Sequence, residues 1–169
     1  MITIRRADKE DLRNLSRKLL TLLKDEESQV FREEAAKFGV PRSYIMKVFS
    51  EAALLEAADK RNATFHIALE GGEIIGFAET IKLDDHTAEL DRLIVFPPWR
   101  GRGVGTSLLH KALADMKKQG VKMVTVNVGR DEVRARRFYE KNGFEGTEER
   151  TVEAPWGREI ALVIYRRRL

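Results

Sequence analysis

The sequence contains no cysteine, and this absence limits the chemistry open to the chain. Without a thiol, the protein can form neither disulfides nor thiolate metal sites, and it cannot carry an acyl group on a cysteine. Its three histidines, His66, His86 and His110, are scattered along the sequence, and none of them pair at a metal-ligand spacing. We therefore predict no metal site.

Long apolar runs are also missing. No segment approaches the roughly 20 apolar residues that a membrane-spanning helix needs. The first residues, Met1 to Arg6, lack the apolar core of a signal peptide. We therefore expect a cytoplasmic protein without a membrane partner. There are no internal repeats or low-complexity segments, and 169 residues fit one domain, 1–169, large enough to bury a core.

Acidic and basic residues are mixed along the chain, and neither sign dominates. The sequence has 31 Lys and Arg against 27 Asp and Glu, a net charge of +4. Charged residues make up 34% of the chain, against a typical figure of about 25%. This mixture favours a charged surface over nucleic-acid binding. The one basic cluster, Tyr165 to Leu169, is too short to indicate DNA binding and leaves it as a weak alternative.

The most informative stretch runs from Leu93 to Leu109 and reads LIVFPPWRGRGVGTSLL. A β-branched run ends at two prolines, passes through three alternate glycines and opens into an amphipathic helix. The glycines let the backbone approach a ligand closely, and the first amides of the helix are unsatisfied donors at its positive end. The pattern predicts a phosphate-binding loop from Arg100 to Thr106. A dinucleotide fingerprint and a Walker loop both fit this stretch less well.

Hydrophobic periodicity predicts alternating strands and helices along the rest of the chain. The expected strands are 2–6, 64–70, 74–83, 87–96, 121–128, 146–153 and 158–166. The expected helices are 8–23, 30–38 and 43–62, one after the glycine loop that ends at Gly120, and one capped by Asp131 and Glu132 that ends at Gly143. Gly71 and Gly72 fit a two-residue hairpin turn. The strands that flank the glycine loop and its helix should lie roughly parallel and nearly side by side.

Two stretches carry a family resemblance: Leu93-x-Val95-x-Pro97-x-x-Arg100-Gly101-x-Gly103-x-Gly105, and Ala135-x-x-Phe138-Tyr-Glu-Lys-Asn-Gly-Phe144. Together they resemble the GNAT superfamily of N-acetyltransferases. The resemblance implies an α/β (α+β) fold, whose mixed, mostly antiparallel sheet is splayed between its fourth and fifth strands and flanked by helices. It also implies acetyl-CoA as the co-substrate, bound in the splay, and a homodimer whose surface the sequence does not identify.

The resemblance assigns roles to particular residues. It places the backbone of Leu93, Ile94 and Val95 along the pantetheine arm, with an amide near Ile94 or Val95 stabilising the oxyanion. The cofactor-binding residues of the loop are Arg100, Gly101, Arg102, Gly103, Val104, Gly105 and Thr106, of which the last five would hold the pyrophosphate through their amides. Tyr139 matches the family tyrosine that meets the thioester sulfur and acts as general acid. A phenol of pKa about 10 can protonate a thiolate without being ionised at neutral pH.

The general base is harder to assign. Many members have a glutamate before the last valine of the fifth strand, where this chain has Asn127, and a neutral amide cannot accept the proton. Glu79, Glu89 and Asp91 are the remaining candidates. A hairpin centred on Asp84 to His86 sets Glu79 beside Asp91, and two adjacent carboxylates raise one pKa toward neutrality. Solvated charges on an exposed sheet face are the alternative interpretation of these residues.

Another departure from the family pattern is Glu132, three residues before Ala135, where asparagine usually contacts the cofactor. Glu132 therefore makes a standard contact doubtful, and the arginines at 130, 134, 136 and 137 either reach the 3′-phosphate or form a solvated helix face.

We interpret the chain as an acetyl-CoA-dependent N-acetyltransferase in which a primary amine attacks directly within a ternary complex. A non-catalytic acyl-CoA sensor with the same fold is the alternative. Protein N-termini, lysine side chains, polyamines and small molecules all stay open as acceptors. The acceptor should be selected by the helices between Lys24 and Asn62 and by the two late loops.

Overall fold

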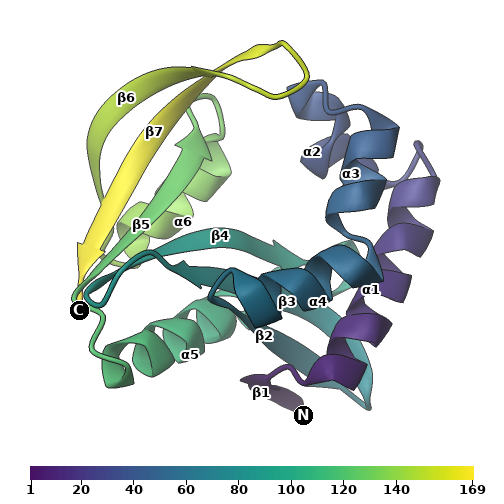
Figure 1. The fold of residues 1–169 in the computed structure, drawn as a ribbon, viewed down its shortest axis with the longest axis horizontal. Helices are drawn as coiled ribbons and strands as arrows, with labels where there is room; N and C mark the ends of the chain where they lie inside the picture. Colours follow the sequence, from purple (N-terminus) through teal and green to yellow (C-terminus); the bar gives the residue numbers. More distant parts are fainter.

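The computed structural model describes residues 1–169 as a mixed sheet with helices on both faces (Figure 1). The strands are β1 (Ile2–Arg6), β2 (Ala63–Glu70), β3 (Glu73–Lys82), β4 (Thr87–Val95), β5 (Met123–Gly129), β6 (Glu145–Glu153) and β7 (Glu159–Arg168). The α-helices are α1 (Lys9–Lys24), α2 (Gln29–Glu34), α3 (Arg42–Val48), α4 (Glu51–Lys60), α5 (Val104–Lys118) and α6 (Val133–Lys141). Two short 3-10 helices, η1 (Ala36–Phe38) and η2 (Pro97–Trp99), complete the chain.

The seven strands follow the order β1-β2-β3-β4-β5-β7-β6. All neighbours are antiparallel except β4 and β5, which are parallel and are joined through α5. This confirms the strand, helix, strand unit and the predicted fold class. Gly71 and Gly72 have φ angles of 58° and 81°. The tight turn between β2 and β3 requires this left-handed backbone, which glycine adopts without a steric penalty.

The sheet opens between β4 and β5. These strands pair only over Thr87–Glu89 with Met123–Thr125. Farther along, β5 keeps its pairing with β7 and β4 keeps its pairing with β3, so their facing edges separate. A bulge on β4, where the partners shift between Glu79 and Thr80, lies at the start of the separation. The predicted splay between the fourth and fifth strands is therefore present.

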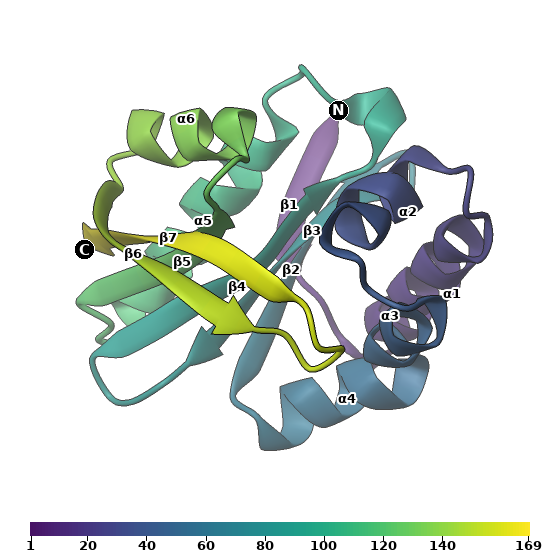
Figure 2. The same cartoon turned by 90° about the horizontal axis from the view of Figure 1, so that it is seen from above.

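Each face of the sheet has its own core. Helices α5 and α6 cover one face, and α1 to α4 gather on the other (Figure 2). The leucine stripe of α1 is buried against the face covered by α1 to α4. The apolar stripe of α5 is buried against the opposite face. No helix here combines the length and the apolar character required to cross a membrane.

The helices before β2 differ from the expectation in two places. The predicted helix 43–62 is two helices, α3 and α4, because Ser50 starts a new one by accepting a hydrogen bond from the Ala53 amide at 3.2 Å. Phe49, at the break, is 1% exposed and packs against Phe77. The predicted helix 30–38 is α2 followed by the 3-10 turn η1. Periodicity missed both breaks since the apolar positions continue through them.

The β6–β7 hairpin reaches across to the N-terminal helices (Figure 1). At its tip the Trp156 indole Nε1 donates to the Phe38 carbonyl at 3.0 Å, and the Trp156 ring meets Tyr44 edge-on at 5.2 Å. Lys37 forms an ion pair with Glu132 at 2.6 Å. These contacts attach η1 to the arm of the splay that contains β5 and β7.

Candidate active site

The glycine loop presents a row of unused donors. Gly101 and Gly103 have φ angles of 77° and 79°, and a side-chain Cβ built at either would meet open space. The amides from Gly101 to Thr106 donate no hydrogen bond within the chain, and no side chain caps the start of α5. Unsatisfied amides at the positive end of a helix dipole bind anions such as phosphate. This geometry fits a pyrophosphate.

The free edge of β4 leads from the splay toward this loop. The Phe96 amide donates to Ile75 on β3 at 2.9 Å. Because successive amides of a strand point to opposite sides, the Val95 amide points toward the open edge. An extended amide-bearing chain could pair with this edge as another strand would. Leu93, Ile94 and Val95 therefore lie where the resemblance puts the pantetheine arm, and their role stays a prediction.

The two loop arginines have partners of their own. Arg100 donates through Nε to the Val95 carbonyl at 2.8 Å, and its guanidinium pairs with Glu33 of α2 at 2.7 Å. Arg102 pairs with Glu70 at 3.0 Å on the surface. Arg100 thus connects the end of β4 to α2, and the backbone amides of the loop are better placed than its side chains to hold a phosphate.

Tyr139 lies on α6 and is 8% exposed. Its ring packs edge-on against Phe138 at 5.2 Å and Phe144 at 5.5 Å. Burial, with a contribution from the charge of Glu34, raises the pKa of Tyr139 well above its usual value. The phenol is therefore protonated at neutral pH and able to donate a proton. Its contact with a thioester sulfur remains a prediction.

The expected pairing of Glu79 with Asp91 is wrong. The bulge shifts the register, so that Glu79 faces Arg92 and Asp91 is left without a cross-strand partner. Arg92 donates to Glu79 at 2.8 Å and to Asp91 at 3.1 Å, and its guanidinium lies over the Phe49 ring at 4.7 Å. Burial raises the pKa of Glu79, and the charge of Arg92 opposes this rise. Asp91 also raises the pKa of Glu79, so the two carboxylates influence each other as expected although the strand register does not pair them.

A carboxylate that the sequence did not single out lies in the same region. Glu34, the last residue of α2, is half-buried, and burial raises its pKa to about 7. The charges of Arg92 and Arg100 oppose this rise, whereas those of Glu33 and Glu132 add to it. The charge of Glu34 also raises the pKa of Tyr139. The Lys37–Glu132 ion pair holds the end of α2, with this carboxylate, near the start of α6, the helix that carries the predicted acid. No motif marks this segment, and only the packing of α2 shows its position.

The structure also shows the surroundings of the other residues that the sequence singled out. We expected Glu132 to cap α6, but its side chain makes no capping hydrogen bond and pairs with Lys37 instead. Asn127 is exposed on β5. Arg136 bonds the Tyr165 hydroxyl at 3.0 Å and the Arg130 carbonyl at 2.9 Å, which favours a structural role for it. Glu89 is half-buried on β4, and burial raises its pKa.

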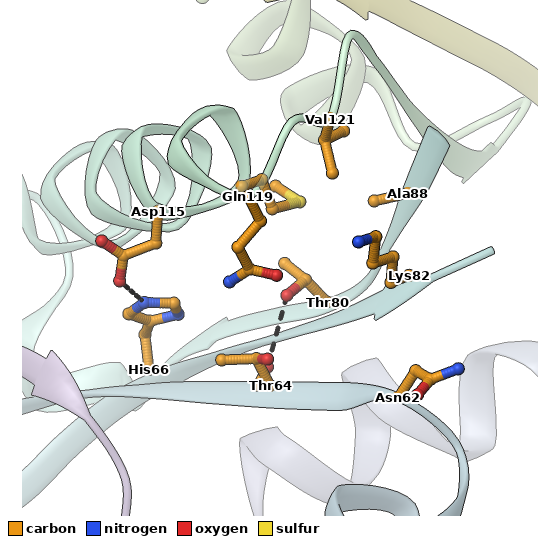
Figure 3. Close-up of a pocket in the computed structure, with 10 residues that line it drawn as sticks. Asn62, Thr64, His66, Thr80, Lys82, Ala88, Asp115, Gln119 and Val121 are labelled. Carbon is orange, nitrogen blue, oxygen red and sulfur yellow. Dashed lines mark hydrogen bonds and ion pairs between the residues drawn. The ribbon is translucent and has the colours of Figure 1, made fainter. Parts of the chain in front are cut away.

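Away from this region, the buried His66 of β2 pairs with the partly buried Asp115 of α5. His66 Nε2 lies 2.6 Å from Asp115 Oδ2, beside a cavity of about 10 Å³ that Thr64, Thr80 and Gln119 also line (Figure 3). Burial lowers the pKa of His66, so the ring is neutral and donates through Nε2, leaving Nδ1 without a partner. The space suits at most one water molecule. None of the predicted site residues line it, and no cluster of potential metal ligands occurs in the chain.

Comparison with known proteins places this arrangement in a family. Residues 20–144 match the family described as "Acetyltransferase (GNAT) family". This range contains the glycine loop, the free edge of β4 and Tyr139. The chain belongs to the GNAT family. The GNAT match confirms the predicted family and an acyltransferase activity, and it agrees with acetyl-CoA as the co-substrate.

Individual relatives agree with the GNAT assignment. An uncharacterized N-acetyltransferase of Mycobacterium tuberculosis is 33% identical over 124 residues, covering 73% of this chain and 80% of that protein. A ribosomal protein bS18-alanine N-acetyltransferase of Haemophilus influenzae is 37% identical over 101 residues, covering 57% and 66%. The PaiA N-acetyltransferase of Thermoplasma acidophilum, solved with coenzyme A, superposes with a TM-score of 0.71 at 23% identity, covering 100% and 99%. The last comparison confirms the GNAT fold.

Proposed function

We propose that the chain transfers the acetyl group of acetyl-CoA to a primary amine by direct attack within a ternary complex. The observation that carries this proposal is the continuity of the site. The unused amides at the start of α5 adjoin the other two parts, because a Cβ built on Gly105 would lie 3.6 Å from Val95 of β4 and 3.8 Å from Phe138, the residue before Tyr139. We take the amides, the free edge of β4 and the phenol of Tyr139 as one path along the splay. Each part suits one part of acetyl-CoA: pyrophosphate, pantetheine and thioester.

The residues of the path have distinct tasks in this reaction. The amides of residues 102–106 hold the pyrophosphate, and the edge of β4 keeps the pantetheine extended. An amide near Val95 donates to the oxyanion that forms as the amine nitrogen bonds the thioester carbon. Tyr139 then gives its proton to sulfur as the carbon–sulfur bond breaks. Direct attack is favoured because the chain has no cysteine to form an acyl-enzyme.

Release of CoA thiol from acetyl-CoA, measured with a panel of amines, tests the proposal. The panel should contain polyamines, peptides with a free N-terminus, lysine-containing peptides and small aminated compounds. We expect thiol release that depends on an amine, together with a product heavier by one acetyl group. Tight binding of acetyl-CoA with no turnover on any amine would contradict the enzyme and favour the acyl-CoA sensor.

Three further expectations belong to this proposal: a homodimer, a cytoplasmic location and a single domain over residues 1–169. Light scattering on the purified protein measures the first. A monomer at micromolar concentration would contradict it.

A further inference from the structure

Helix α2 and the turn after it are fixed to both arms of the splay. On one side of Glu34, Glu33 pairs with Arg100, which in turn bonds the last carbonyl of β4. On the other side, Lys37 pairs with Glu132 at the end of β5. The Phe38 carbonyl is bound by Trp156 of the β6–β7 hairpin. Glu34 lies between these attachments in the chain, so the backbone that carries it runs from one arm of the opening to the other.

The carboxylates near this opening differ in whether their oxygens have a hydrogen-bond or ion-pair partner. Glu79 is 3% exposed and bonded by Arg92, and Asp91 shares the same guanidinium. Glu33 is occupied by Arg100. The pKa of Glu34 reflects burial and more distant charges, with no hydrogen bond from a neighbouring group. Glu89 also has no hydrogen-bond partner, but it lies where β4 still pairs with β5, at the closed end of the splay. Glu34 is therefore the carboxylate at the open end whose oxygens are available to an incoming ammonium group.

Glu34 and Tyr139 approach the splay from different sides. Tyr139 belongs to α6, on the face covered by α5, whereas α2 packs with the helices of the opposite face. Lys37, three residues after Glu34, pairs with Glu132, which directly precedes α6, so the end of α2 lies near the start of the helix that carries Tyr139. The charge of Glu34 accordingly raises the pKa of Tyr139. A group that accepts a proton on one side and a group that donates one on the other is the arrangement that acyl transfer from a thioester to an amine requires.

We propose that Glu34 accepts the proton of the acceptor's ammonium group. This inference rests on the proposed function. Glu34 takes one proton from the ammonium, and the neutral nitrogen forms its bond to the thioester carbon. The carbon–sulfur bond breaks, sulfur receives the proton of Tyr139, and the second proton lost by nitrogen restores Tyr139. One proton passes from Glu34 to solvent per turnover.

The groups that set the titration of Glu34 come from several elements: Arg92 on β4, Arg100 after η2, Glu33 on α2 and Glu132 before α6. The charge of Glu34 in turn raises the pKa of Tyr139 on α6. The two arginines keep the carboxylate ionisable near neutrality despite burial. An acceptor amine can thus lose its proton within the site at a pH where it is protonated in solution.

The test compares wild type with E34Q in the complete protein, using an amine that wild type acetylates. We expect kcat/KM of wild type to fall on the acid side with an apparent pKa near 7. E34Q should lose about 100-fold in kcat, lack that acid limb and keep the wild-type affinity for acetyl-CoA. E34D should recover part of the rate and of the pH dependence. Glu27→Gln, an exposed glutamate in the turn before α2, is the matched control and should behave as wild type.

The outcomes separate the two proposals. If E34Q keeps the rate and the acid limb of wild type, Glu34 is not the base, although the chain is still an acetyltransferase. If wild type binds acetyl-CoA but acetylates no amine, the proposed function fails and this inference fails with it. Loss of acetyl-CoA binding in E34Q would also contradict the inference, because it would make Glu34 part of the donor site.

Discussion

At the scale of single residues, the proposed reaction depends on Tyr139 as the proton donor and on Glu34 as the proton acceptor. The sequence predicts roles for Tyr139 and the glycine loop because the chemistry expected of them needs particular residues at particular spacings. Glu34 could not be found in this way, since its surroundings come from segments far away in the sequence. The pairing of Glu79 with Arg92 instead of Asp91 depends on one bulge residue that strand periodicity does not show.

Burial of Glu34 should reduce stability at neutral and alkaline pH. Its folded pKa of about 7 lies above the ordinary value of 4.5. The folded state is therefore favoured fully below pH 4.5, and this contribution is lost as the pH rises from 4.5 to 7. E34Q should be more stable than wild type by roughly 2 kcal/mol above pH 7 and show little difference below 4.5. Thermal unfolding at both pH values measures this; an equal effect at both would contradict the assignment.

Tyr139→Phe should separate the contribution of the hydroxyl to the reaction from the contribution of the ring to stability. The ring contacts with Phe138 and Phe144 remain, so we expect a small change in Tm together with a fall in kcat of about 100-fold. Tyr165→Phe is the contrasting control. Its hydroxyl donates to Glu140 at 2.6 Å and accepts from Arg136, so that variant should lower Tm and spare kcat. An unchanged kcat in Tyr139→Phe would remove the phenol from the mechanism.

At the scale of elements, the sequence predicted every strand. It did not predict the breaks between α2 and η1 and between α3 and α4, or the bulge on β4. Ser50 can either cap a helix or lie within one. In this fold it caps α4, because the preceding residue, Phe49, is buried in the core at the break between the two helices. Gly76 was likewise unremarkable in the sequence. In the structure it lies on β3 as the cross-strand neighbour of Val95, beside the β4 segment that would bind pantetheine. A Cβ at this position would come within 2.8 Å of the Ile94 carbonyl oxygen and 3.2 Å of Val95 Cα.

Gly76→Ala should therefore weaken acetyl-CoA binding without touching the cofactor. The added methyl pushes Ile94 and Val95 toward the open edge, and we expect a Kd about tenfold higher, equivalent to about 1.4 kcal/mol. Titration calorimetry with acetyl-CoA measures it. Gly146→Ala on β6, whose nearest neighbours would lie at 3.5 Å, is the control and should keep the wild-type Kd. Equal affinities in both variants would mean that the β4 edge is not the pantetheine site.

At the scale of the whole molecule, the arms of the splay are joined at one end by β4–β5 pairing and bridged elsewhere by α2, η1 and the last hairpin. The family resemblance implied the splay, but the bridge has no sequence signature. It arises from single contacts between distant segments, such as Trp156 with Phe38. For this reason the sequence identified the donor and left the acceptor open.

Trp156→Phe should loosen this bridge while leaving the sheet intact. The variant removes the Nε1 donor and retains an aromatic ring for Tyr44, so we expect a loss of about 1 kcal/mol. Amide hydrogen exchange should become faster in residues 36–40 and stay unchanged in β2 and β3. Tyr44→Phe keeps both the ring contact and the indole donor, and should show wild-type exchange. Unchanged protection of residues 36–40 in Trp156→Phe would show that other contacts hold η1.

The central claim is that the splay between β4 and β5 holds acetyl-CoA with its thioester between Tyr139 and Glu34. A crystal structure with bound CoA tests it most directly. We predict pyrophosphate oxygens on the amides of residues 102–106, pantetheine beside Leu93 to Val95, and the sulfur within hydrogen-bonding distance of the Tyr139 hydroxyl. CoA bound elsewhere, or with its sulfur pointing away from Tyr139 and Glu34, would contradict the account.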